Sequence, residues 1–236
     1  MNFYQSIAPY YDHIFPVNPK LISFIEEELH DISGGILDVG CATGGLLTAL
    51  AHLRRPLTGI DLDKEMIEAA QKRTEDVNFL AANMLDLDDL FHENEFALVL
   101  STGNTVVHLD SPKTIGMFFK SIRRVTRQGG TFICQIVNYD RIMAQKLTEL
   151  PTIENDAIRF GRHYSHGPKA ITFQTELLVK AEDRVIENAI DLYPLQSEEI
   201  FALLQEAGFS EIETYGAFNR IPWDRDESFP LIVVAR

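Results

Sequence analysis

The sequence has few cysteines and little positive charge, and each shortage argues against a class of protein. Its two cysteines, Cys41 and Cys134, are too few for a disulfide framework and fall in predicted core segments, as in a reducing compartment. The net charge of −14, from 35 acidic and 21 basic residues, disfavours nucleic acid as a substrate. The best basic cluster, Arg123, Arg124 and Arg127, is short and falls on a predicted helix.

Long apolar runs and repeats are also missing. No stretch approaches the ~18 consecutive apolar residues that a membrane span needs. Residues 1–6 have neither the basic start nor the apolar core of a signal peptide. With 236 residues, 45% of them hydrophobic, the chain suits one globular domain with an elaboration. We therefore expect a cytoplasmic protein that is not in a membrane, and the sequence leaves its oligomeric state open.

The stretch from residue 36 to residue 50 has the pattern of a strand, a tight turn and a helix. A short apolar run ends at Val39, and a turn of small residues from Gly40 to Gly45 follows it. Glycine at 40 and 44 lets the backbone take unusual angles and lets a ligand approach it closely. The helix that follows directs free N–H groups into the same space. The pattern predicts a ligand site at this turn.

A carboxylate ends the next predicted strand, residues 56–60. Asp61 follows Gly40 by 21 residues, close to the ~20 expected for an acid that binds ribose hydroxyls. A cofactor with a nucleoside, lying across the ends of two adjacent strands, explains the turn and the acid together. The alternative is an ordinary strand–helix–strand unit with a solvated aspartate at a strand end.

The turn departs from the dinucleotide-binding fingerprint. Ala42 stands where Gly-x-Gly-x-x-Gly has its second glycine, and Asp38 precedes Gly40 by two residues. A carboxylate would repel a pyrophosphate but attract an ammonium or sulfonium group. The pattern disfavours an NAD-linked oxidoreductase, which remains the alternative enzyme class.

The motifs from Leu37 to Gly44 and from Gly59 to Asp63 resemble the first two motifs of the class I S-adenosylmethionine-dependent methyltransferases. The resemblance covers residues 34–138 by motif and 196–236 by pattern only. It implies S-adenosyl-L-methionine as the cofactor, and methyl transfer to a small-molecule acceptor by in-line displacement as the activity. A binding module that no longer catalyses is the non-enzymatic alternative. The family often has glycine where Ala42 stands.

The resemblance also implies a set of cofactor-binding residues. The Tyr11 hydroxyl would reach the methionine carboxylate, and Leu62 and Met66 would pack against adenine unless they only pack the core. Asn83 stands where the family usually has an acid, and its amide or the Met84 N–H would address the adenine edge. The expected cofactor-binding residues are Tyr11, Asp38, Gly40, Ala42, Gly44, Asp61, Leu62, Met66, Asn83, Met84 and Ser101.

No residue is assigned as catalytic. The cofactor already activates the methyl group, and a base helps only if the nucleophile arrives protonated. The candidates on the substrate side are His108, Tyr4 and His163, with Arg162 and His166 as further possible contacts. His163 and His166 lack a matching second cluster of ligands, so no metal site is predicted.

The expected fold is α/β, with a Rossmann-like, doubly wound and mostly parallel sheet of seven strands. An antiparallel β insertion after the fifth strand is predicted from polar and apolar alternation between residues 139 and 195. The predicted strands of the sheet lie at 36–39, 56–60, 77–81, 96–100, 131–137, 211–217 and 231–235, and the main helices at 19–32, 64–73, 111–126 and 197–207.

The chain is expected to consist of three parts with different functions. Residues 1–33 form an N-terminal helical lid, and residues 34–138 with 196–236 form the cofactor-binding core. Residues 139–195 form a cap that selects the substrate, since long insertions in a compact domain often serve as lids or binding surfaces.

Overall fold

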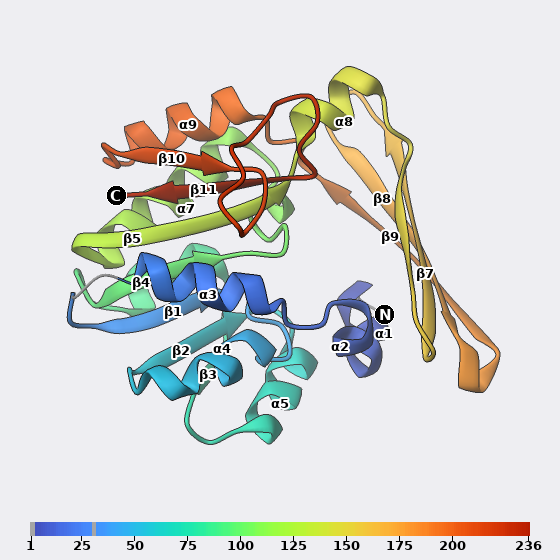
Figure 1. Ribbon diagram of the computed structural model, residues 1–236, viewed down its shortest axis with the longest axis horizontal. Helices are drawn as coiled ribbons and strands as arrows, with labels where there is room; N and C mark the ends of the chain where they lie inside the picture. The colour runs from blue at the N-terminus through green and yellow to red at the C-terminus, as the bar shows by residue number, and fades with distance from the viewer. Residues whose placement is uncertain (1–2, 30–31) are drawn as a thin grey trace.

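A seven-stranded sheet forms the centre of the computed structural model, which describes residues 3–29 and 32–236 (Figure 1). The strand order is β10-β11-β5-β4-β1-β2-β3. Strands β3, β2, β1, β4 and β5 run parallel, and β11 pairs antiparallel with both β5 and β10. The prediction of a Rossmann-like, mostly parallel sheet is therefore confirmed. The strands are β1 Gly35–Val39, β2 Leu57–Asp61, β3 Asn78–Ala81, β4 Phe96–Ser101, β5 Thr126–Val137, β10 Ile212–Tyr215 and β11 Pro230–Ala235.

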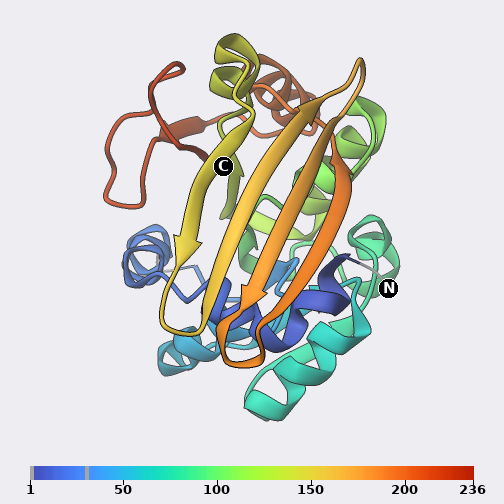
Figure 2. The ribbon, with the colours of Figure 1, turned by 90° about the vertical axis from the view of Figure 1, so that its right-hand side faces the viewer.

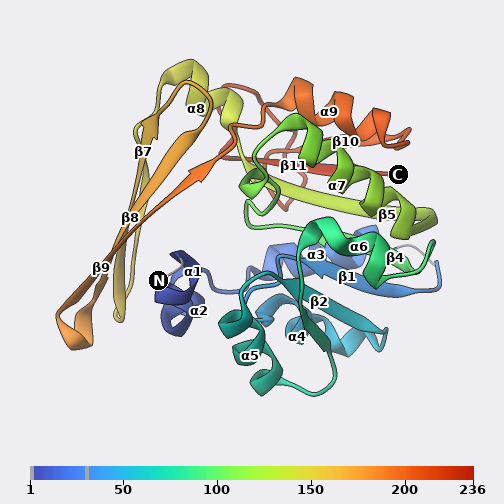
Figure 3. The ribbon, with the colours of Figure 1, turned by 180° about the vertical axis from the view of Figure 1, so that it is seen from behind.

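Helices cover both faces of this sheet. Neighbouring strand residues point to opposite sides, so Ile36 packs with Phe24 of α3 while Leu37 packs with Phe118 of α7. Figure 1 shows α3 in front of the sheet, and Figure 3 shows α6 and α7 on the opposite side. The strands are apolar along their length because both faces are buried. The helices are α3 Pro19–Glu28, α4 Gly45–Leu50 and α5 Lys64–Arg73 on one face, and α6 Leu87–Leu90, α7 Pro112–Val125 and α9 Ser197–Glu206 on the other.

Three of the longer helices begin at side-chain caps that the sequence contains. The Asn18 side chain accepts a hydrogen bond from the backbone of α3, and Pro19 takes the first helical position. Asp63 caps α5 by accepting from the backbone N–H groups of Glu65 and Met66. Ser111 caps α7 in a capping box with Thr114. The caps of α5 and α7 end the loops that follow the carboxyl ends of β2 and β4.

A second sheet of four antiparallel strands follows β5 in the chain. It has the order β6-β7-β8-β9, with β6 Glu149–Glu154, β7 Ile158–His166, β8 Ile171–Val179 and β9 Arg184–Leu192, and α8 Tyr139–Gln145 connects it to β5. Figure 2 views it face-on. The predicted antiparallel insertion is confirmed. Strand β6 was not predicted, because only Leu150 in it is buried and no alternation marks this edge strand.

The N-terminal segment, residues 3–14, lies between the two sheets (Figures 1 and 3). It consists of α1 Phe3–Ile7, a 3₁₀ turn η1 Ala8–Tyr10 and α2 Tyr11–Ile14. One apolar cluster joins Phe3, Ile7 and Ile14 to the inner face of the second sheet, through Ile158, Phe160, Leu177 and Val179. The segment therefore packs on the second sheet through these apolar side chains.

Two predicted boundaries are wrong. Strand β5 begins at Thr126, directly after α7, and not at residue 131. A shift of register against β4 between Phe96 and Leu98, together with Gly129 at φ +75°, lets the strand run through the two glycines that were expected to precede it. Helix α3 ends at Glu28. Its expected continuation to residue 32 passes through residues 30 and 31, which lie outside the described residues.

Candidate active site

The turn after β1 is held by the carboxylate at the end of β2. The backbone N–H of Ala42 donates to Asp61 Oδ2 at 2.9 Å, and the N–H of Asp63 donates to Oδ1 at 2.9 Å. Ala42 has φ +46°, in the left-handed region that favours glycine. A Cβ on Gly40 would lie 2.5 Å from Thr105. These contacts bring the ends of β1, β2 and the loop after β4 together.

The loop after β4 is fixed to β5 by its own side chains. Asn104 has φ +72°, and its amide donates to the Tyr139 hydroxyl at 3.1 Å and accepts from the Val137 N–H at 3.0 Å. The N–H of Gly103 donates to the side chain of Gln135 at 2.8 Å. The backbone at residues 102 and 103 is thereby placed above the switch point between β1 and β4, where open α/β sheets bind ligands.

A first cavity of about 250 Å³ lies over the ends of β1, β2 and β3. It brings together most of the residues that the sequence marked. Leu62 at its edge keeps 69% of its surface exposed, unusual for a leucine beside a cavity. The predicted residues that line it are Tyr4, Tyr11, Gly40, Ala42, Asp61, Leu62, Met66, Asn83, Met84 and His108.

A second cavity of about 270 Å³ adjoins the first. The two share Tyr11, Gly40, Ala42, Thr102 and Gly103 in their walls, so they lie on either side of a common wall. Together they reach the volume typical of small-molecule sites, which is about 300–1,000 Å³.

Asp38 lines the second cavity and is 3% exposed. Its Oδ1 has no hydrogen-bond partner among the described residues. Burial and the charge of Asp61 raise the pKa of the Asp38 carboxyl to about 7. A buried carboxylate oxygen without a partner is costly, so this atom is suited to a cationic ligand.

The walls of both cavities are acidic. Asp12, Asp38, Asp61 and Asp63 line them, and no lysine or arginine of the described residues does so. The imidazole of His108 adds no positive charge near neutral pH, because burial lowers its pKa to about 4. The space therefore favours a cationic or uncharged ligand over an anionic one.

Tyr4 and His108 form a pair at the first cavity. The Tyr4 hydroxyl lies 2.7 Å from His108 Nε2, and the two rings meet edge to face at 5.4 Å. Burial raises the pKa of Tyr4 and lowers that of His108, so both groups are neutral near pH 7. The pair joins α1 to η4, the 3₁₀ turn Val106–His108.

Gly44 and Ser101, two of the predicted cofactor-binding residues, do not line either cavity. Gly44 has φ +74°, and a Cβ there would lie 2.4 Å from the ring of Phe79 on β3. Its glycine is explained by close packing beneath the turn. Ser101 is fully buried at the end of β4, and its hydroxyl has no partner among the described residues.

The polar residues predicted on the second sheet lie away from both cavities. His163 is exposed on β7, across the ladder from Gln174. The Arg162 guanidinium donates to the Pro151 carbonyl, and His166 Nε2 lies 2.8 Å from the Leu147 carbonyl. From this sheet, Ile190 of β9 lines the first cavity instead. The alternation of polar and apolar residues over 184–192 was the signal in the sequence that could have marked Ile190 as a residue of the covered face.

A contact between the N-terminal segment and the turn after β1 was not foreseen. Asp12 accepts a hydrogen bond from the Thr43 hydroxyl at 2.7 Å and pairs with the Arg73 guanidinium. The Nε–H of Arg73 also donates to the Thr43 carbonyl at 3.0 Å. These residues are far apart in the chain and form no local motif, so the sequence carried no signal for this contact.

The described residues contain no group of three or more histidine, cysteine, aspartate or glutamate side chains placed to hold a metal ion. Within the same ranges, no helix has both the length and the apolar character needed to cross a membrane.

Comparison with known proteins finds similarity to methyltransferases. Residues 36–130 match the family model described as "Methyltransferase domain". The carboxy-S-adenosyl-L-methionine synthase of Campylobacter jejuni is 23% identical over 226 residues, which cover 90% of this chain and 87% of that protein. YqeM of Bacillus subtilis, provisionally named a methyltransferase, is 28% identical over 138 residues, 56% of this chain and 55% of YqeM. That match thus spans about half of the relative's length.

Solved structures show the same fold over nearly the whole chain. An S-adenosylmethionine-dependent methyltransferase from Clostridium acetobutylicum has a TM-score of 0.83 at 16% identity, covering 100% of this chain and 99% of that one. The methyltransferase CcbJ from Streptomyces caelestis has a TM-score of 0.81 at 20% identity, covering 98% and 95%.

Residues 36–130 therefore match a methyltransferase domain, and the chain as a whole has the fold of S-adenosylmethionine-dependent methyltransferases.

Proposed function

We propose that the chain is an S-adenosylmethionine-dependent methyltransferase that acts on a small molecule bearing an amine or a hydroxyl group, in the space formed by the two cavities. The observation that carries the proposal is the acidic wall without lysine or arginine, which includes the unpartnered oxygen of Asp38. A carboxylate or phosphate acceptor would find no counter-ion there.

In this proposal the nucleoside of the cofactor occupies the first cavity. Each oxygen of Asp61 already accepts one backbone N–H, and a carboxylate has about four lone-pair sites, so it can still accept from both ribose hydroxyls. The exposed side chain of Leu62 offers the base an apolar face. Asn83 and Met84 meet the edge of the base.

The amino-acid arm of the cofactor then enters the second cavity. Asp38 would accept from its ammonium group and lie near the sulfonium. Burial raises the pKa of Tyr11, so its hydroxyl remains a proton donor at neutral pH and can donate to the carboxylate of the arm. Gly40 and Gly103 have no side chain, so the wall that the two cavities share leaves room for the cofactor.

Bound S-adenosylmethionine supplies an electrophilic methyl group, and the protein must align the nucleophile with it and exclude water. The N-terminal segment and Ile190 of the second sheet close the first cavity on the side away from the main sheet. We propose that they act as the lid and the acceptor wall. The Tyr4 oxygen of the neutral Tyr4–His108 pair can accept a hydrogen bond from the acceptor O–H or N–H, leaving a lone pair free for attack. The proton that the acceptor loses on methylation would pass to Tyr4 while the Tyr4 proton passes to Nε2 of His108, and from there to water.

Neighbours with the same fold agree with this acceptor class. KedS8, named a sugar N-methyltransferase, has a TM-score of 0.73 and covers all of this chain. CalS10, named an amino pentose methyltransferase, has a TM-score of 0.71 and the same coverage of this chain. The likeness to carboxy-S-adenosyl-L-methionine synthase adds no second candidate, because the described cavity walls offer no cation for an added carboxylate.

The test is a measurement of methyl transfer with matched acceptors. S-adenosylhomocysteine formation is followed with amines, alcohols and carboxylic acids that share one carbon skeleton. We expect transfer to the amine or the alcohol and none to the carboxylic acid. Preferential use of the carboxylic acid would overturn the acceptor class. The protein could instead bind S-adenosylmethionine, transfer its methyl group to no compound of the panel, and show no slow transfer to water. That result would favour a binding module that does not catalyse.

A further inference from the structure

We infer that this methyltransferase meets the base of its cofactor with hydrogen-bond donors at Asn83 and Met84, and therefore discriminates only weakly between adenine and hypoxanthine. The inference rests on the placement of the nucleoside proposed above. It concerns the cofactor alone and does not depend on which acceptor is methylated.

The side chain of Asn83 has one of its two polar atoms already committed. Its Oδ1 accepts from the Leu85 N–H at 2.9 Å and so caps η3, the 3₁₀ turn Met84–Asp86. The Asn83 carbonyl accepts from the Asp86 N–H at 3.0 Å. The remaining polar atom is Nδ2, which has no hydrogen-bond partner within the described ranges. Asn83 lines the first cavity, so the group available to a ligand is a donor.

A second donor stands beside it. Met84 is the first residue of η3, and the N–H groups at the start of a helix have no partner within the helix. Met84 also lines the first cavity. Two neighbouring residues that line the same cavity therefore each have a donor without a partner among the described residues.

The base of the cofactor must reach this place if the ribose binds Asp61. Asp61 pairs with Ala81 in the ladder between β2 and β3, and the N–H of Ala82 donates to the Asp61 carbonyl at 2.9 Å. Asn83 follows one residue later. Leu62, next to Asp61, supplies the exposed apolar surface on which a ring can lie. Ribose at Asp61 thus leaves the base between Leu62 and the two donors.

Two donors match each base equally. The Watson–Crick edge of adenine carries an acceptor at N1 and a donor at the 6-amino group, whereas that of hypoxanthine carries a donor at N1 and an acceptor at O6. Against Met84 N–H and Asn83 Nδ2, each base makes one matched pair and one mismatched pair. An aspartate at position 83 would keep the cap with one oxygen and present an acceptor with the other, which matches adenine at both positions.

The experiment compares two ligands that differ only at this edge. Affinities of S-adenosylhomocysteine and S-inosylhomocysteine, in which a carbonyl replaces the 6-amino group, are measured by calorimetry for the native protein and for Asn83→Asp. We expect the native affinities to lie within about 10-fold of each other, and the preference for adenine to rise by at least about 10-fold in Asn83→Asp.

Asn83→Ser is the matched control, because serine also caps η3 but presents no second polar atom. Its ratio of affinities is expected to stay within about 3-fold of the native ratio. A native preference for adenine above about 100-fold, or an unchanged ratio in Asn83→Asp, overturns the inference. Failure of the native protein to bind either ligand overturns it together with the placement of the nucleoside. No acceptor is present, so a wrong acceptor class cannot cause either result.

Discussion

The Tyr4 hydroxyl lies 2.7 Å from Nε2 of His108, although the two residues come from α1 and η4 and are 104 positions apart in the chain. The pair is therefore complete only when the N-terminal segment is in place. Its function is testable without disturbing the packing of the segment.

Tyr4→Phe removes the hydroxyl and keeps the ring contacts with Phe3 and His108. We expect kcat for methyl transfer to fall by about 10-fold or more, with little change in the affinity for S-adenosylhomocysteine, because the pair acts on the acceptor. Steady-state kinetics and calorimetry measure the two quantities. Tyr10→Phe on the same segment is the control, since the Tyr10 hydroxyl bonds Glu182 on the exposed surface. Equal losses in both variants would contradict the role of Tyr4.

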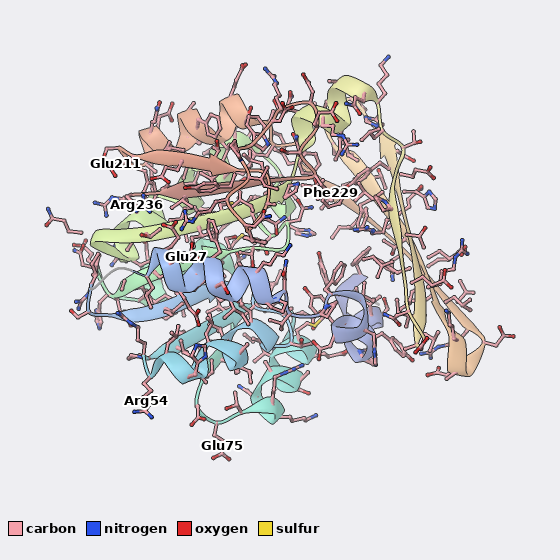
Figure 4. The ribbon with its side chains drawn as sticks, in the orientation of Figure 1. Glu27, Arg54, Glu75, Glu211, Phe229 and Arg236 are labelled. Atoms are coloured by element: carbon pink, nitrogen blue, oxygen red, sulfur yellow. The ribbon has the colours of Figure 1, made fainter. Side chains whose placement is uncertain are left out.

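Asp61→Ala removes the acceptor proposed for the ribose and two hydrogen bonds that hold the turn. We expect S-adenosylmethionine binding to become undetectable by calorimetry while the fold stays intact. Thermal unfolding should show a loss of about 1–3 kcal/mol from the freed N–H groups. Glu75→Ala is the control and should change neither quantity. Glu75 is an exposed residue after α5 and is labelled in Figure 4. Native affinity in Asp61→Ala would refute the assignment.

Asp38 and His108 should give the ligand-free protein opposing dependences of stability on pH. The pKa of Asp38 is raised to about 7, so the folded state keeps a proton that the unfolded state releases, and stability falls as pH rises from about 4 to about 7. The pKa of His108 is lowered to about 4, so stability rises with pH from about 4 to about 6.5.

Asp38→Asn removes the first of these dependences. The variant should gain stability relative to the native protein as pH rises, by as much as about 4 kcal/mol at pH 7, while it binds S-adenosylmethionine more weakly. Urea unfolding at pH 5 and pH 8 measures the gain, and calorimetry measures the affinity. The contribution of His108 is read from His108→Gln, which should lose stability relative to the native protein as pH rises. A stability difference for Asp38→Asn that does not grow with pH would rule out the raised pKa.

Glu28 ties α3 to the C-terminal part of the chain. Its buried side chain is 2% exposed and pairs with Arg220 at 2.6 Å and with Arg236. Glu28→Gln leaves both guanidinium groups without their shared partner, so we expect a loss of about 2–4 kcal/mol in the free energy of unfolding.

Glu27→Gln is its matched control. Glu27 also pairs with Arg220, but it is 59% exposed and lies with Arg236 on the face labelled in Figure 4. The free energy of unfolding of Glu27→Gln should fall by less than about 1 kcal/mol, as for other surface ion pairs. Chemical denaturation of both variants gives the comparison, and similar losses would show that burial does not set the value of the Glu28 contact.

The parts of the site that were predictable from sequence are those encoded locally. Asp61 and Gly40 stand at a spacing that one strand–helix–strand unit imposes, so the chain alone placed them together. Gly44 belongs to the same motif, yet the sequence could not separate a ligand contact from packing against Phe79.

The remaining parts depend on contacts between distant segments. The pairing of Asp12 with Thr43 and Arg73, and the meeting of Tyr4 with His108, depend on how the N-terminal segment folds back. His163 was chosen for its chemistry, but the twofold period of a strand left open which face of the second sheet would be covered. Strand β6 lacked alternation because it lies at an edge.

The cluster that joins Phe3, Ile7 and Ile14 to the second sheet has a consequence for engineering. One apolar cluster supports both the N-terminal segment, which we propose as the lid, and the second sheet, which we propose as the acceptor wall. Redesigning that wall for a bulkier acceptor, by trimming Ile190, which lines the first cavity and packs against this cluster, would loosen the N-terminal segment as well. We therefore expect acceptor selectivity and cofactor residence time to be coupled, so that a laboratory-evolved change in one should appear as a change in the other.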